Sequence, residues 1–454
     1  MASSTRSGVI TLLHTACGAG VLAMPYGFKP FGLIPGLLVI IFCALCSLGG
    51  LLLQAKVARY VPEKSASFFT LTQIINPNLS VIFDIAIAIK CFGVGVSYMI
   101  VVGDLTPQIA SVFTSNHLLL DRNVHITLIM LFIVSPLCFL KRLSSLRYAS
   151  LIALLSVAYL CVLIFIHFVW PSEEIHDLKG HVSLWIPHDE TNPLTTLPIF
   201  VFAYTCHHNM FSVINEQKDT SFRHIKKVAI YAMFLALSLY LLVGGMGYLT
   251  FGDHIIGNII KLYPQFASTT VGRIAIVLLV MLAFPLQCHP ARASINHILF
   301  YLQEHLSQSK QNTRTDNTAN AVDEASTLIV NGDQEYMIDE LIEEDSANQP
   351  PVVPLHGRKF VIITIFLLLA SYLLAISVSS LARVLAVVGS TGSTSISFIL
   401  PGIFGYQLIG SEVDSGSLPF KTKLFKYAGL ALAVWGVVVM ATCLTATLTM
   451  NASH

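Results

Sequence analysis

The sequence predicts an all-α integral membrane protein with eleven transmembrane helices. Composition is the first reason: 54% of its 454 residues are hydrophobic and 11% are charged, whereas roughly a quarter of the residues in an ordinary soluble domain are charged. The second is that apolar runs of about 20 residues, enough to cross roughly 30 Å of hydrocarbon, recur along the chain. The third is the uneven distribution of lysine and arginine between alternate loops.

The eleven apolar segments follow one another with short polar connections, except for one long connection before the ninth. Their expected ranges are 8–27, 32–58, 81–105, 124–140, 148–170, 194–215, 227–250, 271–290, 360–380, 382–408 and 425–449. The ninth and tenth segments lie close together around Arg383, where the sequence marks their division least sharply. Residues 1–305, with helices 1–8, and residues 358–454, with helices 9–11, are expected to build a single domain.

The basic residues predict the orientation of the helices. With a cytosolic N-terminus, the cytosolic segments collect 19 lysines and arginines and the opposite side collects six, as the positive-inside rule requires. The remaining basic residue, Lys90, falls inside the third helix. The C-terminus is then expected on the side opposite the cytosol, where Asn451 begins an Asn-Ala-Ser sequence that is a potential glycosylation site.

Residues 306–357 form the long polar connection. Between Gln311 and Pro350 they include ten acidic residues and one basic residue, Arg314. A segment with so little apolar surface is expected to be a disordered cytosolic loop. Within it, Glu324–Ile329 fits the acidic dileucine pattern that sorting adaptors bind, with a chance match as the alternative.

Two of the predicted helices contain interruptions. The first includes Gly18, Ala19, Gly20 and Pro25, which have low helix preference or little bulk. The sixth includes the run 202–209, where polar side chains follow one another near the middle of the membrane. Irregular backbone at that depth is tolerated only where the freed polar groups find partners or line a cavity. The two breaks, which would be equivalent if helices 1–5 and 6–10 are inverted repeats, therefore predict a binding site.

Several stretches resemble the amino acid/auxin permease family, which includes the sodium-coupled neutral amino-acid transporters and the fungal vacuolar amino-acid transporters. These stretches are Gly18–Pro25 in the first helix, Phe92–Tyr98 with Gly103–Asp104 in the third, Phe202–His207 in the sixth, Phe284–Arg292 in the eighth and Gly389–Pro401 in the tenth. The resemblance covers nearly all of the membrane-embedded sequence. It is strongest to the fungal vacuolar branch associated with export of acidic amino acids from the vacuole to the cytosol.

The resemblance implies a LeuT-like core of two inverted five-helix repeats, with broken helices 1 and 6, followed by an eleventh helix. It places the substrate between the unwound parts of the two broken helices. The residues expected there are Thr15, Gly18, Ala19, Gly20, Tyr204, Thr205 and His207. A half-helix N-terminus at the first break offers backbone N–H groups to a carboxylate.

The resemblance also bears on the coupling ion. Sodium-coupled relatives commonly use an Asn of helix 1 and a Thr of helix 8 as oxygen ligands, and the matching positions here are His14 and Ala283. Neither side chain supplies a hard oxygen, whereas histidine changes charge between an acidic lumen and a neutral cytosol. We therefore expect proton coupling, with His14, His207, His208 and His289 as candidate carriers. A neutral, hydrogen-bonded packing role is the alternative for each histidine.

Lys90 lies in the middle of the third predicted helix, where an unpaired charge costs about 2.5–3.5 kcal/mol on insertion scales. One interpretation is a contact with the side-chain carboxylate of an acidic substrate, and the other is pairing with helix C-terminal carbonyls or with an acid. Asp84, six residues away, faces a different side of the helix. Asp104 and Glu216 lie near helix ends, where gating or capping contacts are expected.

The Gly- and Ser-rich run 389–397 has two interpretations. A phosphate-binding loop would need a lysine and a preceding strand, which this run lacks. Small side chains in a membrane helix allow close approach of a neighbouring helix and hydrogen bonds between helices. We therefore expect packing and gating from this run.

Together these features predict a proton-coupled secondary transporter in the vacuolar membrane, which exports amino acids, chiefly glutamate and aspartate, to the cytosol by alternating access. Its expected partners are an amino acid, protons and membrane lipid. A neutral amino-acid transporter of the same fold, coupled to protons or sodium, is the main alternative. An amino-acid sensor is less favoured, because about seven residues precede the first helix. We expect no enzyme, cofactor, metal or nucleic-acid partner, since His207-His208 lacks the i, i+4 spacing of paired metal ligands.

Overall fold

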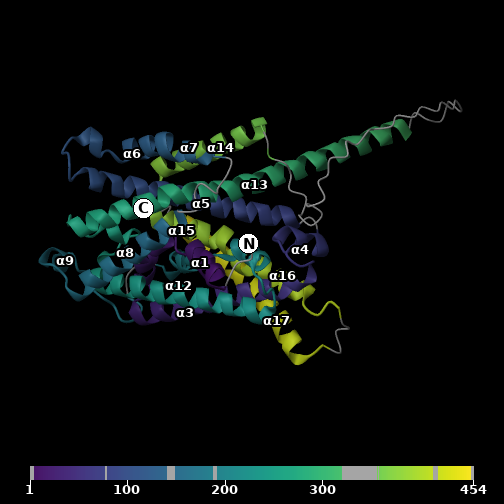
Figure 1. The fold of residues 1–454 in the computed structure, drawn as a ribbon, viewed down its shortest axis with the longest axis horizontal. Coiled ribbons are helices and arrows are strands. Elements are labelled where there is room, and N and C mark those ends of the chain that lie inside the picture. Colours follow the sequence, from purple (N-terminus) through teal and green to yellow (C-terminus); the bar gives the residue numbers. More distant parts are fainter. Residues whose placement is uncertain are drawn as a thin grey trace.

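The structure is a computed structural model that describes residues 5–76, 79–140, 149–187, 192–319, 355, 357–412 and 418–450. Helices of the α, 3-10 and π types build the molecule, and most of them run roughly parallel to its long axis (Figure 1). Nearly every buried apolar side chain belongs to one continuous core. The all-helical architecture predicted from the sequence is therefore confirmed.

Helices occupy each of the eleven segments expected to cross the membrane. In chain order the α-helices are α1 (Thr5–Ala16), α2 (Gly20–Phe28), α3 (Leu33–Val57), α4 (Phe68–Ile75), α5 (Leu79–Ala110), α6 (Arg122–Ile129), α7 (Ser135–Cys138), α8 (Ala149–Val169), α9 (Glu173–Asp177), α10 (Leu197–Ala203), α11 (Met210–Glu216), α12 (Phe222–Phe251), α13 (Ala267–Ala319), α14 (Gly357–Ser377), α15 (Leu381–Val388), α16 (Leu400–Leu408) and α17 (Phe420–Thr449).

Length and hydropathy separate the helices that could cross a membrane by themselves from the shorter ones. Among the described residues, eight helical spans are long and apolar enough to cross a membrane, and a ninth results if α1 and α2 form one broken span. Arg122–Cys138, which joins α6 and α7, is a shorter apolar helix. Helices α10 and α11 have seven residues each and are separated by an interruption, so neither reaches that length by itself. The count of eleven crossings stays a prediction.

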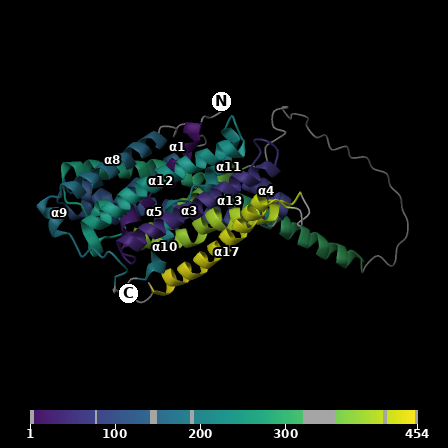
Figure 2. The same cartoon turned by 90° about the horizontal axis from the view of Figure 1, so that it is seen from below.

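Several details of the fold were not apparent from the sequence. Helix α13 continues to Ala319 and projects beyond the bundle (Figures 1 and 2), so it enters the segment expected to be a loop. The short helix α4, capped at Ser67, lies between the second and third expected segments. The sorting motif at Glu324–Ile329 and the sequon at Asn451 lie outside the described residues.

The division between the ninth and tenth segments is clear in the structure. Helix α14 ends at Ser377, and Ser380 caps α15 by accepting a hydrogen bond from the backbone N–H of Arg383. The Gly- and Ser-rich run then forms two π-helical segments, η9 (Gly389–Ser393) and η10 (Ser395–Ile399), before α16. π-helical turns of this kind are frequent at functional sites.

Two groups of helices meet along the centre of the bundle. Helix α5 packs along α13 and also contacts α14, α15 and α6. Helix α12 packs against α1, α2 and α3, and α10 contacts α2 and η9. Figures 1 and 2 place α4 and the projecting part of α13 at one end of the bundle, the α4 end, and α9 at the other, the α9 end.

Gly50 of α3 lies where this helix meets two other elements. A Cβ atom at this position would lie 2.7 Å from Nε2 of His207 and closer still to the carbonyl oxygen of Ser397. A Cβ atom at the neighbouring Gly49 would have no atom within 4 Å. Two adjacent glycines therefore differ completely in the space around them.

Gly50→Ala is expected to destabilise the protein by about 1–3 kcal/mol, the usual cost of overpacking a filled interior. The thermal unfolding midpoint of the detergent-purified protein measures the effect. Gly49→Ala is the matched control and is expected to unfold at the wild-type temperature or slightly above it, because alanine favours the helix. Equal midpoints for the two variants would contradict the close approach at Gly50.

Candidate functional site

The two helix breaks predicted from the sequence lie against each other. Helices α1 and α2 are bent by 62° at their break, and the turn η6 (His207–Asn209) separates α10 from α11. A Cβ atom on Gly20 would lie 3.3 Å from Cα of Ala203, the last residue of α10. The side chain of Asn209 donates a hydrogen bond to the hydroxyl of Thr15 at 2.8 Å. The expected substrate-binding residues of the two breaks are thus brought together.

A tyrosine from a third helix connects both breaks. The hydroxyl oxygen of Tyr240, on α12, lies 2.9 Å from the carbonyl oxygen of Ala16 and 2.8 Å from that of Ala203. These residues end α1 and α10, where helical carbonyls lack partners within their own helix. A hydroxyl group has one hydrogen to donate. The carbonyl of Ala16 also accepts a hydrogen bond from the backbone N–H of Gly18 at 2.9 Å, so the carbonyl of Ala203 is the one that keeps capacity for a further cation or N–H group.

The polar run of the sixth segment is held against α3. Nε2 of His207 lies 2.9 Å from the carbonyl oxygen of Ser47, so this nitrogen carries a hydrogen and donates it. Gln54 donates to the carbonyl oxygen of His207 at 3.1 Å, and the Ser47 hydroxyl donates to the carbonyl oxygen of Tyr204 at 3.1 Å. Thr205 accepts a hydrogen bond from Ser397 of η10 at 3.2 Å. The structure therefore gives His207 a clear anchoring role.

Lys90 lies against His208 and Gln287. Its buried ammonium nitrogen is 3.3 Å from Nε2 of His208 and 3.4 Å from Oε1 of Gln287. Neither of these two contacts is with an acid or a helix carbonyl. Those are the structural partners that the sequence suggests for Lys90. Asp84 pairs instead with His297 of α13, at 3.5 Å. The sequence had indicated that Asp84 was badly placed for Lys90.

Gln287 and Tyr98 belong to this site but were not selected from the sequence. Gln287 interacts with the hydroxyl of Tyr98, and that hydroxyl would lie 3.2 Å from a Cβ on Gly18. A continuous set of polar groups thus connects the first helix break with Lys90. Both residues fall within the stretches that carry the family resemblance, which was the available signal.

A cavity of about 470 Å³ at the α4 end leads to this set. Small-molecule sites commonly enclose about 300–1,000 Å³. Its wall combines residues of α4, α5, α11 and α13 with the loop before α4, and includes Ser67, Asp84, His208, Phe211, Asn215 and His297. His208 therefore lines the cavity on one side and contacts Lys90 on the other. It is the candidate proton carrier that contacts Lys90.

The two other candidate histidines lie in different surroundings. His14 is half-buried on α1, and His289 is exposed on α13.

Beside the first break, a cavity of about 10 Å³ is lined by Gly18, Ala19, Val21, Leu22, Val157, Leu160, Ile276, Leu279 and Val280. None of these lining side chains carries an oxygen atom that a sodium ion could use.

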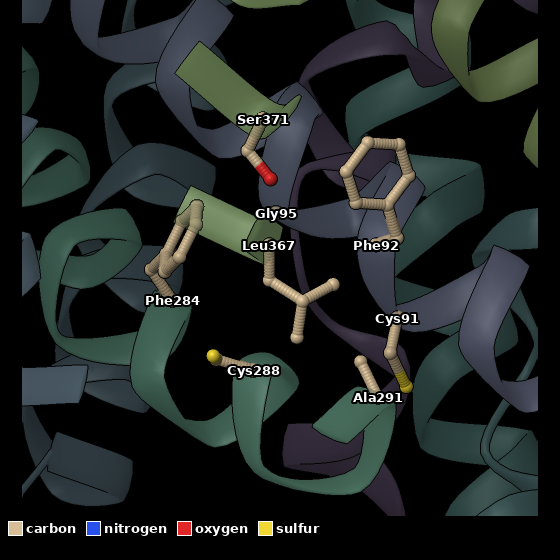
Figure 3. A pocket seen from close by; sticks show the side chains of 8 residues that line it. All are labelled: Cys91, Phe92, Gly95, Phe284, Cys288, Ala291, Leu367 and Ser371. Atoms are coloured by element: carbon tan, nitrogen blue, oxygen red, sulfur yellow. The ribbon is translucent and has the colours of Figure 1, made fainter. Parts of the chain in front are cut away.

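A further small cavity lies between α5, α13 and α14. Figure 3 shows the side chain of Leu367 near its centre, with Phe284 and Cys288 of α13 on one side and Phe92 of α5 on the other. Its volume of about 10 Å³ is no larger than a water molecule needs. This region is a tightly packed helix interface and is too small for an amino acid.

The Gly- and Ser-rich run packs closely against its neighbours. A Cβ atom on Gly392 would lie 2.8 Å from the backbone nitrogen of Lys90, and one on Gly389 would collide with the carbonyl group of Pro198. Ser397 of the same run donates to Thr205. These contacts agree with the packing role expected from the sequence.

Comparison with known proteins identifies relatives along the whole chain. The family model described as "Transmembrane amino acid transporter protein" matches residues 1–442. Vacuolar amino acid transporter 6 of Saccharomyces cerevisiae is 63% identical, with 99% of this chain and 100% of that protein covered. Vacuolar amino acid transporter 5 of Schizosaccharomyces pombe is 37% identical, with 96% and 93% covered. The family resemblance found in the sequence is therefore confirmed.

More distant relatives extend the comparison. Sodium-coupled neutral amino acid transporter 7 of Bos taurus is 22% identical, with 91% of this chain and 81% of that protein covered. The crystal structure of MhsT in complex with L-phenylalanine superimposes with a TM-score of 0.53 at 12% identity, covering 97% of this chain and 99% of that one. At this identity the likeness to MhsT shows a shared fold.

Tyr240→Phe is expected to destabilise the protein, because it leaves the buried carbonyl group of Ala203 without the Tyr240 donor and removes one of the two donors to the carbonyl of Ala16. An unsatisfied buried group costs about 1–3 kcal/mol. The thermal unfolding midpoint of the purified protein measures this loss. Tyr231, on the same helix, is 54% exposed, and Tyr231→Phe is the matched control. If the midpoint fell equally in both variants, the bridging role of the Tyr240 hydroxyl would be wrong.

Proposed function

The chain belongs to the transmembrane amino acid transporter family, and from this premise we propose that it exports glutamate and aspartate from the vacuole to the cytosol together with protons. The substrate assignment rests on Lys90. The buried cation of Lys90 contacts a histidine, His208, and an uncharged amide, that of Gln287. The fungal relatives, which are vacuolar amino acid transporters by name, support a vacuolar amino-acid transporter.

The proposed architecture has eleven membrane crossings, with a LeuT-like core of two five-helix repeats. The broken pairs α1–α2 and α10–α11 are its first and sixth helices. The N-terminus lies in the cytosol, the C-terminus lies in the lumen, and the α4 end of the bundle faces the cytosol. The distribution of basic residues and the MhsT likeness support this arrangement.

The backbone of the amino acid binds at the two breaks. The N–H groups of Val21 and Leu22 donate to the carbonyl oxygens of Gly18 and Ala19, so the N–H groups of Ala19 and Gly20 are those that suit a carboxylate. The carbonyl oxygen of Ala203, whose donor is the Tyr240 hydroxyl, suits the ammonium group better than that of Ala16, which also accepts from Gly18. Thr15, Gly18–Gly20, Tyr204 and Thr205 are the surrounding substrate-binding residues. Every amino acid has these two charged groups, so this part of the site sets the substrate class.

The side chain of an acidic amino acid reaches Lys90. A buried ammonium group without an acid is costly, and a substrate carboxylate would compensate its charge through a charge-assisted hydrogen bond. His208 and Gln287 already contact the ammonium group and are placed to add donors. This arrangement favours glutamate and aspartate over neutral amino acids.

A proton is the proposed coupling ion. His14 and Ala283 occupy the positions where the sodium-coupled relatives commonly carry oxygen ligands, and the cavity beside the first break is lined by apolar side chains. Among the four candidate carriers, His208 has the strongest support, because it lines the cavity at the α4 end and contacts Lys90. His14, His207 and His289 are secondary candidates.

A neutral amino-acid transporter of the same fold is the second candidate function. It is favoured by the name of the more distant relative, a sodium-coupled neutral amino acid transporter. In that case Lys90 would serve the structure alone, and sodium or a proton would drive transport.

Lys90→Met is expected to reduce glutamate transport by about 10- to 100-fold, because a hydrogen bond to a charged group contributes about 1.5–3 kcal/mol. Uptake of labelled glutamate and glutamine into proteoliposomes that contain the purified protein measures the change. Glutamine transport by the same variant is the internal control for folding. Equal losses for both substrates would refute a contact between Lys90 and the substrate side chain.

Flux under an imposed pH gradient tests the coupling ion. Glutamate transport is expected to increase when the lumenal side is acidified and to stay within twofold when sodium is replaced by potassium. The measurement uses reconstituted protein of known orientation, with protein-free liposomes as the control. A strict requirement for sodium would exclude proton coupling and favour the second candidate.

A further inference from the structure

The strongest remaining feature is a buried carboxylate at the α9 end of the bundle. The side chain of Asp104 is 5% exposed. It lies on α5 twenty positions after Asp84, which lines the cavity at the opposite end. At 1.5 Å per residue, the two acids are about 30 Å apart along the helix. One long helix thus places a charged group at each end of the bundle.

Three side chains from two other elements converge on Asp104. Its Oδ1 lies 3.5 Å from Nζ of Lys261 and 3.9 Å from Nε of Arg122, the first residue of α6. The side chain of Asn258 donates to its other oxygen at 3.3 Å. Two cations therefore face one carboxylate, and these are the charged groups recorded against it.

Lys261 and Asn258 belong to the loop that joins α12 to α13, residues 252–266, which we call the capping loop. It folds over the α9 end of the bundle. Gly257 of this loop packs against Ala382 of α15, where a Cβ atom would lie 2.8 Å away, and the 3-10 turn η8 (Ile259–Lys261) contacts α2. The loop therefore contacts helices of the broken-helix region as well as α5.

Further hydrogen bonds join the capping loop to α5 beside Asp104. The side chain of Gln108 donates to the carbonyl oxygen of Lys261 at 3.2 Å, and the side chain of Gln265 donates to the carbonyl oxygen of Gln108 at 2.6 Å. These bonds are between uncharged groups. Of the recorded contacts between the loop and α5, the ion pair of Lys261 with Asp104 is the one that a proton can remove.

We propose that Asp104 is a proton-binding site of the transport cycle and that its protonation releases the capping loop. When a proton binds, the carboxylate becomes a neutral carboxyl group and both ion pairs are lost. Arg122 and Lys261 then remain as two like charges without the anion between them. The loop is then held to α5 by the uncharged hydrogen bonds of Asn258, Gln108 and Gln265 and by the packing of its buried side chains, without the ion pair.

This proposal rests on the proposed function, which places the α9 end in the acidic lumen. The structure has its large cavity at the α4 end and the capping loop closed at the other. Alternating access requires that one end open while the other is closed. A carboxylate that opens the lumenal end when protonated would couple entry of the substrate to entry of a proton.

Asp104→Asn tests the proposal, because asparagine keeps the size of the side chain and removes its charge. Hydrogen–deuterium exchange of the purified full-length protein, followed in peptides covering residues 252–266, reports opening of the loop. At neutral pH we expect exchange in Asp104→Asn at least 10-fold faster than in the wild type. At equal acidic pH the two proteins should exchange alike. Exchange in the variant equal to that in the wild type at neutral pH would overturn the proposal.

Lys261→Met separates the proton-binding group from its partner. This variant removes the loop's side of the ion pair but keeps the carboxylate and Arg122. Its loop should therefore exchange faster than in the wild type at neutral pH, and acidification should accelerate that exchange less than in the wild type. Asp121, one residue before Arg122, is an exposed acid at the same end and caps α6. Asp121→Asn is the matched control, because asparagine caps a helix equally well. Its exchange should match that of the wild type at both pH values.

Flux distinguishes failure of this proposal from failure of the proposed function. If wild-type glutamate flux increases with lumenal acid, the flux of Asp104→Asn should lose at least half of that response. An unchanged pH response in the variant would refute a coupling role for Asp104 while leaving proton-coupled transport in place. If wild-type flux ignores pH, the proposed coupling is wrong, and the exchange experiment still decides whether Asp104 holds the loop.

Discussion

The arrangement of the bundle depends on how the backbone of its two broken helices is satisfied. In hydrocarbon there is no water to hydrogen-bond a freed carbonyl, so the protein must supply the donor. The Tyr240 hydroxyl lies within hydrogen-bond distance of the last carbonyls of both α1 and α10, and the carbonyl of α1 also accepts from Gly18. Asn209 and Thr15 add a direct contact between the two breaks. Helix α12 therefore fixes the distance between two segments that are far apart in the sequence.

Two adjacent histidines illustrate how little separates an anchoring residue from one that lines a cavity. Successive residues of a helical turn point about 100–120° apart. His207 consequently faces α3, where it donates to Ser47, while His208 faces Lys90 and the cavity. The absence of a side chain at Gly50 gives the His207 ring its space. The contacts that hold the His207 ring in place therefore also orient the ring of His208.

Helix α5 connects the parts of the molecule that carry charge. Asp84 pairs with His297 at the cavity, Lys90 contacts His208 at mid-length, and Asp104 holds the capping loop at the far end. Its long contact with α13 makes it a rigid support for these groups. One continuous helix therefore places ionisable groups at both ends of the bundle and at mid-length.

The helices, their two breaks and the family are apparent from the sequence alone, because the effects of hydrophobicity, glycine and proline are local and remain visible in one dimension. The sequence also identified Lys90 as a costly charge that needs a partner. Only the tertiary structure decided what that partner is: His208 and Gln287 lie more than a hundred residues from Lys90. The same holds for Tyr240 and for the cations around Asp104, since contacts between distant helices depend on which faces meet. For the same reason the structure gave His207 an anchoring contact that its place in the motif did not reveal.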